Sequence, residues 1–325
     1  MKFKSYIKPR YKHILLLIVA VAAIYGMGRL YYSLTGGFTE GNITYALPYD
    51  PRWDITPVST QEKVQLEGIL AQEFFYLGKG CQSYVFSSKD GKYVLKFFKY
   101  QRFRPQAWLD YVAFIPPVNE YRQRKIEKKK RKLDNVFSSW VLAYEELKPE
   151  TGAVFVHLNK GGNLNPNFVI YDKMGYKHSL NLNNYEFLLQ KKAKMLCPSL
   201  LEVRDQGDLV KAKKLIDDLF AMILLEYSRG YADNDHALMQ NTGVFNGDPI
   251  HIDVGQFIKN PIVKDSQVYR QELFSKTWKF RIWLKKYYPE LAVYTEDKLR
   301  GIIGEKFETM KPELNKASMG RIPNA

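Results

Sequence analysis

The hydrophobic residues of this chain form one uninterrupted run near the start and then shorter segments with helical or strand-like spacing. Ile14–Gly28 is a stretch of fifteen residues without a charge, and Tyr31 and Tyr32 follow shortly behind it. An apolar run with a basic flank before it and aromatic residues behind it is typical of a membrane-spanning helix. The run is short for a span of roughly 20 residues, but its flanks extend it. We therefore predict a transmembrane anchor over residues 14–34.

The segment before the anchor, residues 1–13, is a basic tail without acidic residues. Its five basic residues are Lys2, Lys4, Lys8, Arg10 and Lys12. Only Arg29 lies close behind the apolar run, so the positive-inside rule places the rest of this single-pass chain on the non-cytoplasmic side. The alternative is a signal peptide cleaved at the A-x-A sequence Ala20-Val21-Ala22, which would leave a very short apolar core.

Residues 35–60 contain several glycines and prolines and little periodicity, which predicts a linker or an extended strap before a folded domain over residues 61–325. Hydrophobic residues make up 46% of the chain, enough for a sizeable core. Cys81 and Cys197 are the only cysteines, so the sequence holds neither a disulfide framework nor a cysteine zinc site. The net charge of +15 favours acidic partners: nucleotide, anionic lipid or nucleic acid.

Residues Phe74–Tyr100 predict a β-hairpin that begins with a glycine-rich turn. Gly78 and Gly80 lack side chains, so the backbone there can approach phosphate groups and donate N–H groups to them. The returning strand, Tyr93–Phe98, places Lys96 in the middle of an apolar stretch. Burying an ammonium group costs several kcal/mol unless an anion meets it. Lys96 is therefore the most informative residue of this segment.

Residues Asn119–Leu147 predict a long helix, because apolar residues recur at steps of three and four. Its first half, RQRKIEKKKRK, is strongly basic, and Trp108, Tyr111 and Phe114 precede it at helical spacing. Such a basic run is usually a solvated helix face; the alternatives are an anionic membrane or nucleic acid. No aromatic residues interleave with the basic ones to stack on bases, so we do not expect a nucleic-acid partner.

The segments that follow alternate between strand-like and helical patterns. Ala153–Leu158 and Phe168–Asp172 predict strands, whereas Tyr185–Met195 and Leu209–Tyr227 predict helices, the second of which ends at Gly230. Two more helices are predicted near the C-terminus, at Gln267–Tyr287 and Thr295–Phe307.

Residues Tyr231–Phe257 combine a polar loop, a short hairpin and an acidic turn. The turn of the hairpin is predicted at Asn246-Gly247, because both residues tolerate positive φ. Carboxylates and amides that one hairpin brings together are suited to hold Mg²⁺ beside a nucleotide. The candidates are Asp233, Asp235, Gln240, Asn241 and Asp253.

Together these two segments resemble the protein-kinase-like superfamily. Residues 77–86, LGKGCQSYVF, are similar to a kinase glycine-rich loop, and Lys96 is similar to the lysine of the third strand. In that family an Asn follows the catalytic Asp after five residues, and the Asp of D-F-G comes thirteen residues later. Here Asp253 lies 18 residues after Asp235 and 13 after Gln240.

The resemblance has three departures. No His-Arg pair precedes Asp235, Gln240 occupies the Asn register with Asn241 one place late, and Val254 replaces the Phe of D-F-G. The sequence also lacks A-P-E, and only residues 258–325 follow the second segment. The family's C-terminal lobe is therefore expected in an abbreviated, atypical form.

The resemblance implies an α+β, two-lobed protein-kinase-like fold behind the N-terminal transmembrane helix. The N-lobe, an antiparallel sheet plus a helix, would cover about 61–173, and the mostly helical C-lobe about 174–325. The hinge between them would be Asp172–Leu182. A glutamate of the long helix would pair with Lys96, the candidates being Glu120, Glu127, Glu145 and Glu146.

The resemblance also implies ATP and Mg²⁺ as cofactors and a role for each matching residue. Asp235 would orient the acceptor hydroxyl. The glycine-rich loop and the third-strand lysine would bind the phosphates, through Gly78, Gly80, Ser83 and Lys96. The metal would be held by Asp253 with Gln240 or Asn241.

The function expected on these grounds is phosphoryl transfer from ATP to a hydroxyl on a protein or membrane-associated glycan, by a membrane-anchored kinase. ATP is ordinarily cytoplasmic, which conflicts with the side that the charge rule predicts. The domain therefore lies in an ATP-supplied lumen, or the topology is inverted, or turnover has been lost. Two alternatives stay open: a pseudokinase that acts as a nucleotide-binding or scaffold module, and a basic membrane-surface protein without nucleotide.

Overall fold

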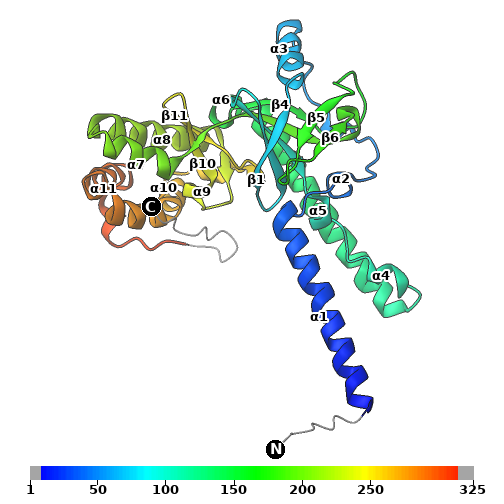
Figure 1. Cartoon of the computed structure of the whole chain (residues 1–325). Coiled ribbons are helices and arrows are strands. Elements are labelled where there is room, and N and C mark those ends of the chain that lie inside the picture. The colour runs from blue at the N-terminus through cyan, green and yellow to red at the C-terminus, as the bar shows by residue number, and fades with distance from the viewer. Residues whose placement is uncertain (1–8, 314–325) are drawn as a thin grey trace, which may run out of the picture.

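The structure, a computed structural model, describes residues 9–313 and shows a mixed α+β body with one long helix standing away from it (Figure 1). A seven-stranded sheet with its covering helices forms one region, residues 36–191, which we call the sheet region. The remainder, residues 192–313, is mostly helical and is called the helical region.

The sheet has the order β4-β7-β3-β2-β1-β5-β6, with all neighbours antiparallel except β1 and β5. Alternation along β3 buries Leu95 and Phe97 in one apolar core and turns Lys96 and Phe98 to the opposite face. The strands are β1 (Phe74–Lys79), β2 (Ser83–Ser88), β3 (Tyr93–Phe98), β4 (Ala153–His157), β5 (Phe168–Tyr171), β6 (Lys177–Leu180) and β7 (Phe187–Lys191).

Helices and short turns surround this sheet. A strap from the end of α1 crosses it, with Phe38 and Ile43 buried in its core, so residues 35–60 are a packed strap rather than a free linker. The helical elements of this part are α1 (Pro9–Thr35), α2 (Glu40–Ile43), η1 (Pro51–Trp53), α3 (Thr60–Leu70), η2 (Tyr100–Arg102), α4 (Trp108–Tyr111), α5 (Pro116–Glu145), α6 (Lys148–Thr151) and η3 (Leu182–Asn184).

The helical region has its own apolar core, built mainly from α7, α8, α10 and α11. The α8 helix ends at Gly230, whose φ of +84° is the left-handed conformation of a C-cap. The elements are β8 (Lys194–Met195), α7 (Leu196–Asp205), α8 (Leu209–Arg229), β9 (Tyr231–Asp233), α9 (Leu238–Asn241), β10 (Thr242–Phe245), β11 (Asp248–His251), β12 (Phe257–Lys259), η4 (Pro261–Lys264), α10 (Ser266–Tyr287), α11 (Pro289–Ile303) and η5 (Gly304–Glu308).

Several predicted elements are confirmed. The long basic helix is α5, the helix that ends at Gly230 is α8, and the acidic hairpin is β10 and β11. Its turn uses positive φ at both predicted positions, +53° at Asn246 and +96° at Gly247. The predicted anchor lies inside α1, in which Tyr11–Thr35 is long and apolar enough to cross a membrane. Residues 1–8 of the predicted basic tail lie outside the described residues.

Two predictions are wrong. Tyr185–Met195 is not a helix: it forms β7, an inner strand between β3 and β4, and the short β8. An apolar run such as FLL fits a buried strand as well as a helix, and here its place inside the sheet decided the outcome. Asp172–Leu182 is not a hinge but contains the turn between β5 and β6 and the strand β6. The chain therefore leaves the sheet after Lys191 rather than near residue 173.

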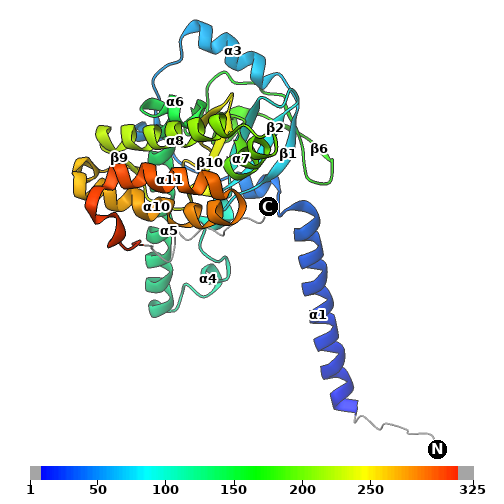
Figure 2. The same ribbon diagram turned by 90° about the vertical axis from the view of Figure 1, so that its left-hand side faces the viewer.

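Two elements project from the same side of the body. Figures 1 and 2 show α1 leaving the sheet region as an isolated helix, and the first half of α5, with α4 beside it, leaving in the same general direction. Leu133 is the first buried residue of α5, so the half of the helix before it extends beyond the core.

Candidate functional site

A cavity of about 480 Å³ lies where the sheet region meets the helical region. The β1–β2 turn covers it, β3 and α5 form its back, and the chain after β7 and the turn after β11 close the remaining sides. Its size and its largely apolar wall are those of a small-molecule site. The residues that line it include Gly78, Gly80, Gln82, Ser83, Lys96, Trp140, Gln190, Gln240 and Asp253.

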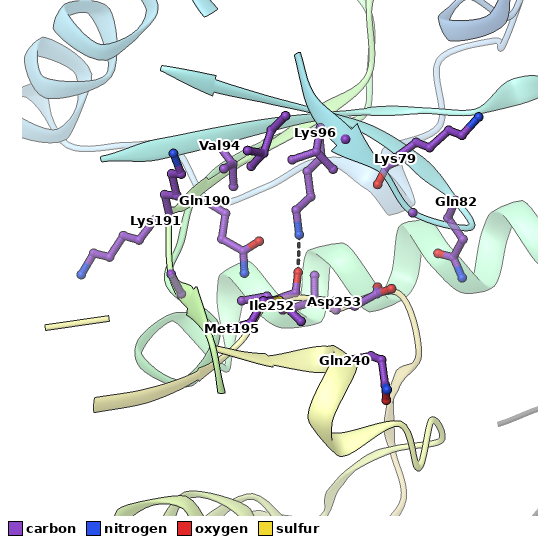
Figure 3. Close-up of a pocket in the computed structure, with 18 of the residues that line it drawn as sticks. Lys79, Gln82, Val94, Lys96, Gln190, Lys191, Met195, Gln240, Ile252 and Asp253 are labelled. Atoms are coloured by element: carbon purple, nitrogen blue, oxygen red, sulfur yellow. Dashed lines mark hydrogen bonds between the residues drawn. The ribbon is translucent and has the colours of Figure 1, made fainter. Parts of the chain in front are cut away.

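Lys96 lies at the centre of the sheet, opposite Val85 on β2 and Leu188 on β7. Its side chain is 9% exposed and its Nζ donates a hydrogen bond to the Ile252 carbonyl (Figure 3). Burial lowers the pKa of the ammonium group to about 8, although Asp253 acts in the opposite direction. An anionic ligand in the cavity would supply a negative charge to pair with this lysine.

Asp253 follows β11 directly and faces the same cavity from the opposite side (Figure 3). Its Oδ1 accepts a hydrogen bond from the Gly255 N–H at 3.2 Å, which closes a tight turn. Asp253 is an exposed residue that opens onto the cavity. Desolvation by the surrounding protein atoms raises the pKa of the Asp253 carboxyl, and Lys96 opposes the rise.

The glycine-rich turn has open space at the cavity. A Cβ atom on Gly78 would meet nothing within 4 Å, and one on Gly80 would only touch the Ser83 Oγ at 4.0 Å. Neither glycine has positive φ, so it is the open space, and not the backbone conformation, that distinguishes them. The Gly80 N–H is bonded to the Ser83 carbonyl at 3.0 Å. The free turn amides in the described structure are therefore those of Cys81 and Gln82.

The same turn touches the loop that carries Asp253. A Cβ atom added to Gly255 would lie 2.2 Å from the Gln82 Oε1, so a side chain at position 255 would require the Gln82 side chain to move. Gly255 thus allows the Gln82 side chain of the turn over the cavity to pack against the turn below it.

The loop after β9 separates the roles of its two aspartates. Asp233 is 5% exposed, forms an ion pair with the buried Lys276 at 2.9 Å, and accepts the Asp235 N–H at 3.0 Å. Asp235 is half-buried, and its Oδ1 accepts the Ala237 N–H at 3.0 Å. Asp233 therefore holds the loop together, and Asp235 is the more accessible carboxylate.

The two amide candidates also separate. Gln240 lines the cavity from α9, whereas Asn241 is 6% exposed and is not among the lining residues. The Asn241 backbone carbonyl instead accepts the Ile252 N–H at 2.7 Å, which ties α9 to the strand before Asp253. No group of three His, Cys, Asp or Glu side chains suited to a metal occurs within residues 9–313. A single carboxylate plus an amide is a donor set for a Mg²⁺ that a nucleotide also coordinates.

The glutamate expected on α5 does not reach Lys96. Glu145 accepts hydrogen bonds from Thr56, at 2.6 and 2.8 Å, while the other candidates on α5 pair elsewhere or lie exposed, and none of the four is bonded to Lys96 in the described chain. α5 instead presents Trp140 to the cavity, stacked on Phe98 with 3.9 Å between ring centroids. The pairings of the other candidates are Glu120 with Arg124 at 3.8 Å and Glu146 with Lys259 at 3.5 Å.

α5 nevertheless holds the turn of Asp253. The Ser139 hydroxyl donates to the Val254 carbonyl at 2.5 Å and accepts the Phe257 N–H at 2.6 Å. Ser139 is 1% exposed, so these two bonds are not shared with solvent. The helix thus fixes the turn of Asp253 from behind through a hydroxyl rather than through a carboxylate.

Gln190, at the end of β7, is a site residue that the sequence analysis missed. Its Nε2 donates to the carbonyls of Thr151 and His251, at 2.5 and 2.7 Å, which fixes the orientation of the amide. Its Oε1 is buried and has no hydrogen-bond partner among the described residues.

Ser139, Trp140 and Lys276 were missed as well. Lys276 lies in the sequence LFSKTW, where its neighbours Ser275 and Thr277 are polar, so it lacks the apolar flanks that identified Lys96. Gln190 was hidden because its strand was predicted as a helix. Nothing in the local sequence distinguishes Ser139 or Trp140 from ordinary core residues.

Comparison with known proteins gives no family for this chain. No family model matches the sequence, and no curated protein matches it significantly. Among solved structures, the bifunctional kinase-methyltransferase WbdD superposes with a TM-score of 0.34 and 15% identity over 71% of this chain. This chain spans 44% of WbdD.

Two further structures give similar values. WbdD in complex with the kinase inhibitor LY294002 has a TM-score of 0.32 and 16% identity, covering 73% of this chain and 46% of WbdD. Rv3197 from Mycobacterium tuberculosis, in complex with erythromycin, has a TM-score of 0.29 and 14% identity, and the match covers 88% of this chain and 75% of Rv3197. Similarities at this level establish no shared activity, so the functional argument rests on the geometry of the cavity.

Proposed function

We propose that this chain is a membrane-anchored kinase that transfers the γ-phosphoryl group of ATP to a hydroxyl on a protein or a membrane-associated glycan. The observation that carries the proposal is the pairing of Lys96 and Asp253 across one cavity beneath a glycine turn. A buried ammonium to which no carboxylate is bonded among the described residues fits the phosphates of a nucleotide. A carboxylate that opens onto the same cavity fits the cation that accompanies those phosphates.

Each residue has a defined task in this mechanism. Lys96 neutralises charge on the phosphates, which the Cys81 and Gln82 amides cover from above. The apolar wall receives the base. Asp235 orients the acceptor hydroxyl and accepts its proton. Catalysis is then mainly positioning and charge stabilisation.

Asp253 and Gln240 are the residues that would hold Mg²⁺. Asp253 is exposed to the cavity and Lys96 is the cation that acts on it, so the carboxylate can take a second positive charge and the donor set fits the ion. When bound, the metal supplies charge neutralisation at the β- and γ-phosphates.

The first test is a thermal-shift titration of the full-length protein in detergent with MgATP. A ligand at 100 times its Kd stabilises by about 2.7 kcal/mol, which is readily measured. Lys96→Met and Asp253→Ala should abolish the shift. Two exposed residues on the neighbouring turns give matched controls, Lys92→Met and Asp248→Ala, which should keep it. A folded wild type without any shift would contradict the proposal.

A second candidate function is nucleotide binding without transfer. The absence of a carboxylate bonded to Lys96 within the described residues favours it, because that ion pair normally holds the lysine in place for transfer. The two functions differ in turnover. An MgATP-dependent shift without phosphate release or acceptor labelling, with membranes supplied as acceptor source, would identify the binding module.

The proposed anchor is α1, and the charge rule for the linear sequence puts the body on the non-cytoplasmic side. Protease protection of the body in sealed vesicles tests this assignment. Protection in right-side-out vesicles, without protection in inverted ones, would show that the body faces the cytoplasm, the side on which ATP is ordinarily found.

A further inference from the structure

An arm projects from the body on the side of α1. It consists of residues 105–132, which include α4 and the first half of α5, and we call it the arm. From Pro116 at its far end to Leu133, the first buried residue of α5, the helix extends about 25 Å, at 1.5 Å per residue. In both views the tip of the arm lies level with the middle of α1 rather than with the body (Figures 1 and 2).

The tip of the arm exposes large apolar side chains. Tyr111 and Phe114 are 82% and 80% exposed, and Trp108 is 57% exposed. The one acidic residue there, Asp110, is paired with Arg122 at 2.7 Å. Exposed aromatic residues in such a cluster mark an interaction surface rather than an ordinary solvated loop.

Behind the tip, the arm is strongly basic. Eight basic residues stand against three acidic ones, and the basic residues all follow Tyr121. The basic residues are Arg122, Arg124, Lys125, Lys128, Lys129, Lys130, Arg131 and Lys132, and the acidic ones are Asp110, Glu120 and Glu127. The surface is thus ordered along the axis of the arm: aromatic and apolar at the tip, cationic behind it.

This order matches the depth profile of a bilayer surface. Aromatic residues prefer the interface and the edge of the acyl region, and long basic side chains reach phosphate headgroups just above it. An anionic headgroup layer attracts each nearby Lys or Arg. A soluble partner would require no such ordering with depth.

The position of α1 relative to the arm is fixed by direct contacts with the body. Lys79 donates to the Gly36 carbonyl at 2.5 Å, Lys173 donates to the Ser33 carbonyl at 2.7 Å, and the Tyr84 hydroxyl donates to the Gly37 carbonyl. The helix therefore leaves the body in a set direction. If α1 crosses a membrane, the arm must meet the surface of the same membrane.

We propose that the arm is a second membrane-binding element, whose aromatic tip inserts into the bilayer spanned by α1 and whose basic stretch binds anionic lipid headgroups. The inference rests on the membrane anchor of the proposed function but not on its kinase activity. The partner is a lipid surface that carries net negative charge.

The test uses the full-length chain in nanodiscs made with or without phosphatidylglycerol. An environment-sensitive NBD label is placed at Phe114→Cys, in a Cys81→Ser background because Cys81 is exposed. A label at Val293→Cys, a 63% exposed position on α11, is the matched control. We expect blue-shifted emission at position 114, quenching by doxyl-labelled lipids, and a larger shift in anionic discs. The label at position 293 should keep the emission of a water-exposed label, and doxyl-labelled lipids should not quench it.

A second variant separates charge from insertion. Arg124→Gln, Lys128→Gln, Lys130→Gln and Arg131→Gln together should remove the difference between anionic and neutral discs while leaving the MgATP thermal shift measured in detergent unchanged. If the label at position 114 shows the same water-exposed emission as the label at 293, in discs that contain the protein, the inference is overturned. Blue-shifted emission at position 114 that doxyl lipids do not quench would also overturn it, because it would show contact with another protein chain. Failure to enter discs points instead to the anchor, and loss of the MgATP shift alone to the kinase proposal.

Discussion

Replacing Lys96 by Met should make the protein without ligand more stable while it abolishes nucleotide binding. Burial lowers the pKa of Lys96 from 10.5 to about 8, so at pH 7 the folded state holds a charged group that it disfavours. The difference corresponds to about 3 kcal/mol in favour of the unfolded chain. Methionine removes this penalty and keeps an apolar side chain of similar length, but it also removes the hydrogen bond to the Ile252 carbonyl.

The lost hydrogen bond offsets about 1 kcal/mol of the gain, which leaves a net stabilisation of about 2 kcal/mol at pH 7. For a chain of this size that is a rise in Tm of about 4 °C. The penalty is complete below the folded pKa of about 8 and disappears as the pH rises toward 10.5, because the lysine is then neutral in both states. The advantage of the variant should therefore shrink between pH 8 and pH 10.

The assay is thermal unfolding of the full-length protein in detergent at a series of pH values, with and without MgATP. Lys92→Met, on the exposed turn before the same strand, controls for the loss of a lysine as such. A lower Tm for Lys96→Met, or a stability difference that does not change with pH, would show that Lys96 is not a destabilising buried charge. An unchanged MgATP response would show that the lysine does not contact the nucleotide.

Three further substitutions test other parts of the structure. Glu186 is fully buried, and burial raises the pKa of its carboxyl to about 7, so the free energy of unfolding should fall as the pH rises from 4.5 to 7. Glu186→Gln should remove most of this pH dependence and, in denaturant titrations at pH 8, raise the free energy of unfolding by up to about 3 kcal/mol. Gly78→Ala has room for its Cβ, so the Tm should change by less than about 2 °C, whereas the affinity for MgATP should drop at least tenfold. A large loss of Tm would contradict the open space at this position. Lys276→Met leaves Asp233 buried without its cation and should cost about 3–5 kcal/mol, whereas Lys276→Arg should recover part of it.

The sequence predicted the parts of the site that depend on local pattern. A lysine in an apolar strand, glycines before a hairpin, and two carboxylates at a fixed spacing all reflect chemistry within a short segment, and the structure brings Lys96 and Asp253 to one cavity. The type of the segment Tyr185–Met195 could not be obtained this way. Its apolar residues fit a strand or a helix equally well, and only pairing between β3 and β4 selects the strand.

Contacts between distant segments were also outside the reach of the sequence. α5 was predicted, but its rotation was not, and that rotation presents Ser139 and Trp140 to the site instead of a glutamate. The basic character of its first half was evident as well. Whether that half was solvated or faced a membrane depended on the direction in which the helix leaves the body, which no local pattern specifies.

The two elements that extend toward the proposed membrane also contact the two turns that border the proposed nucleotide site. At the end of α1, the Lys79 Nζ lies 3.8 Å from the centroid of the Tyr32 ring and donates a hydrogen bond to the Gly36 carbonyl. The end of the anchor therefore contacts the glycine turn directly. At the other element, α5, Ser139 holds the turn of Asp253 by two hydrogen bonds. A tilt of either helix in the bilayer must therefore move one of the two loops that meet at Gly255 and Gln82. It follows that nucleotide affinity should differ between detergent and anionic nanodiscs in the wild type. The variant in which Gln replaces four of the eight basic residues of the arm should bind nucleotide equally in anionic and neutral discs.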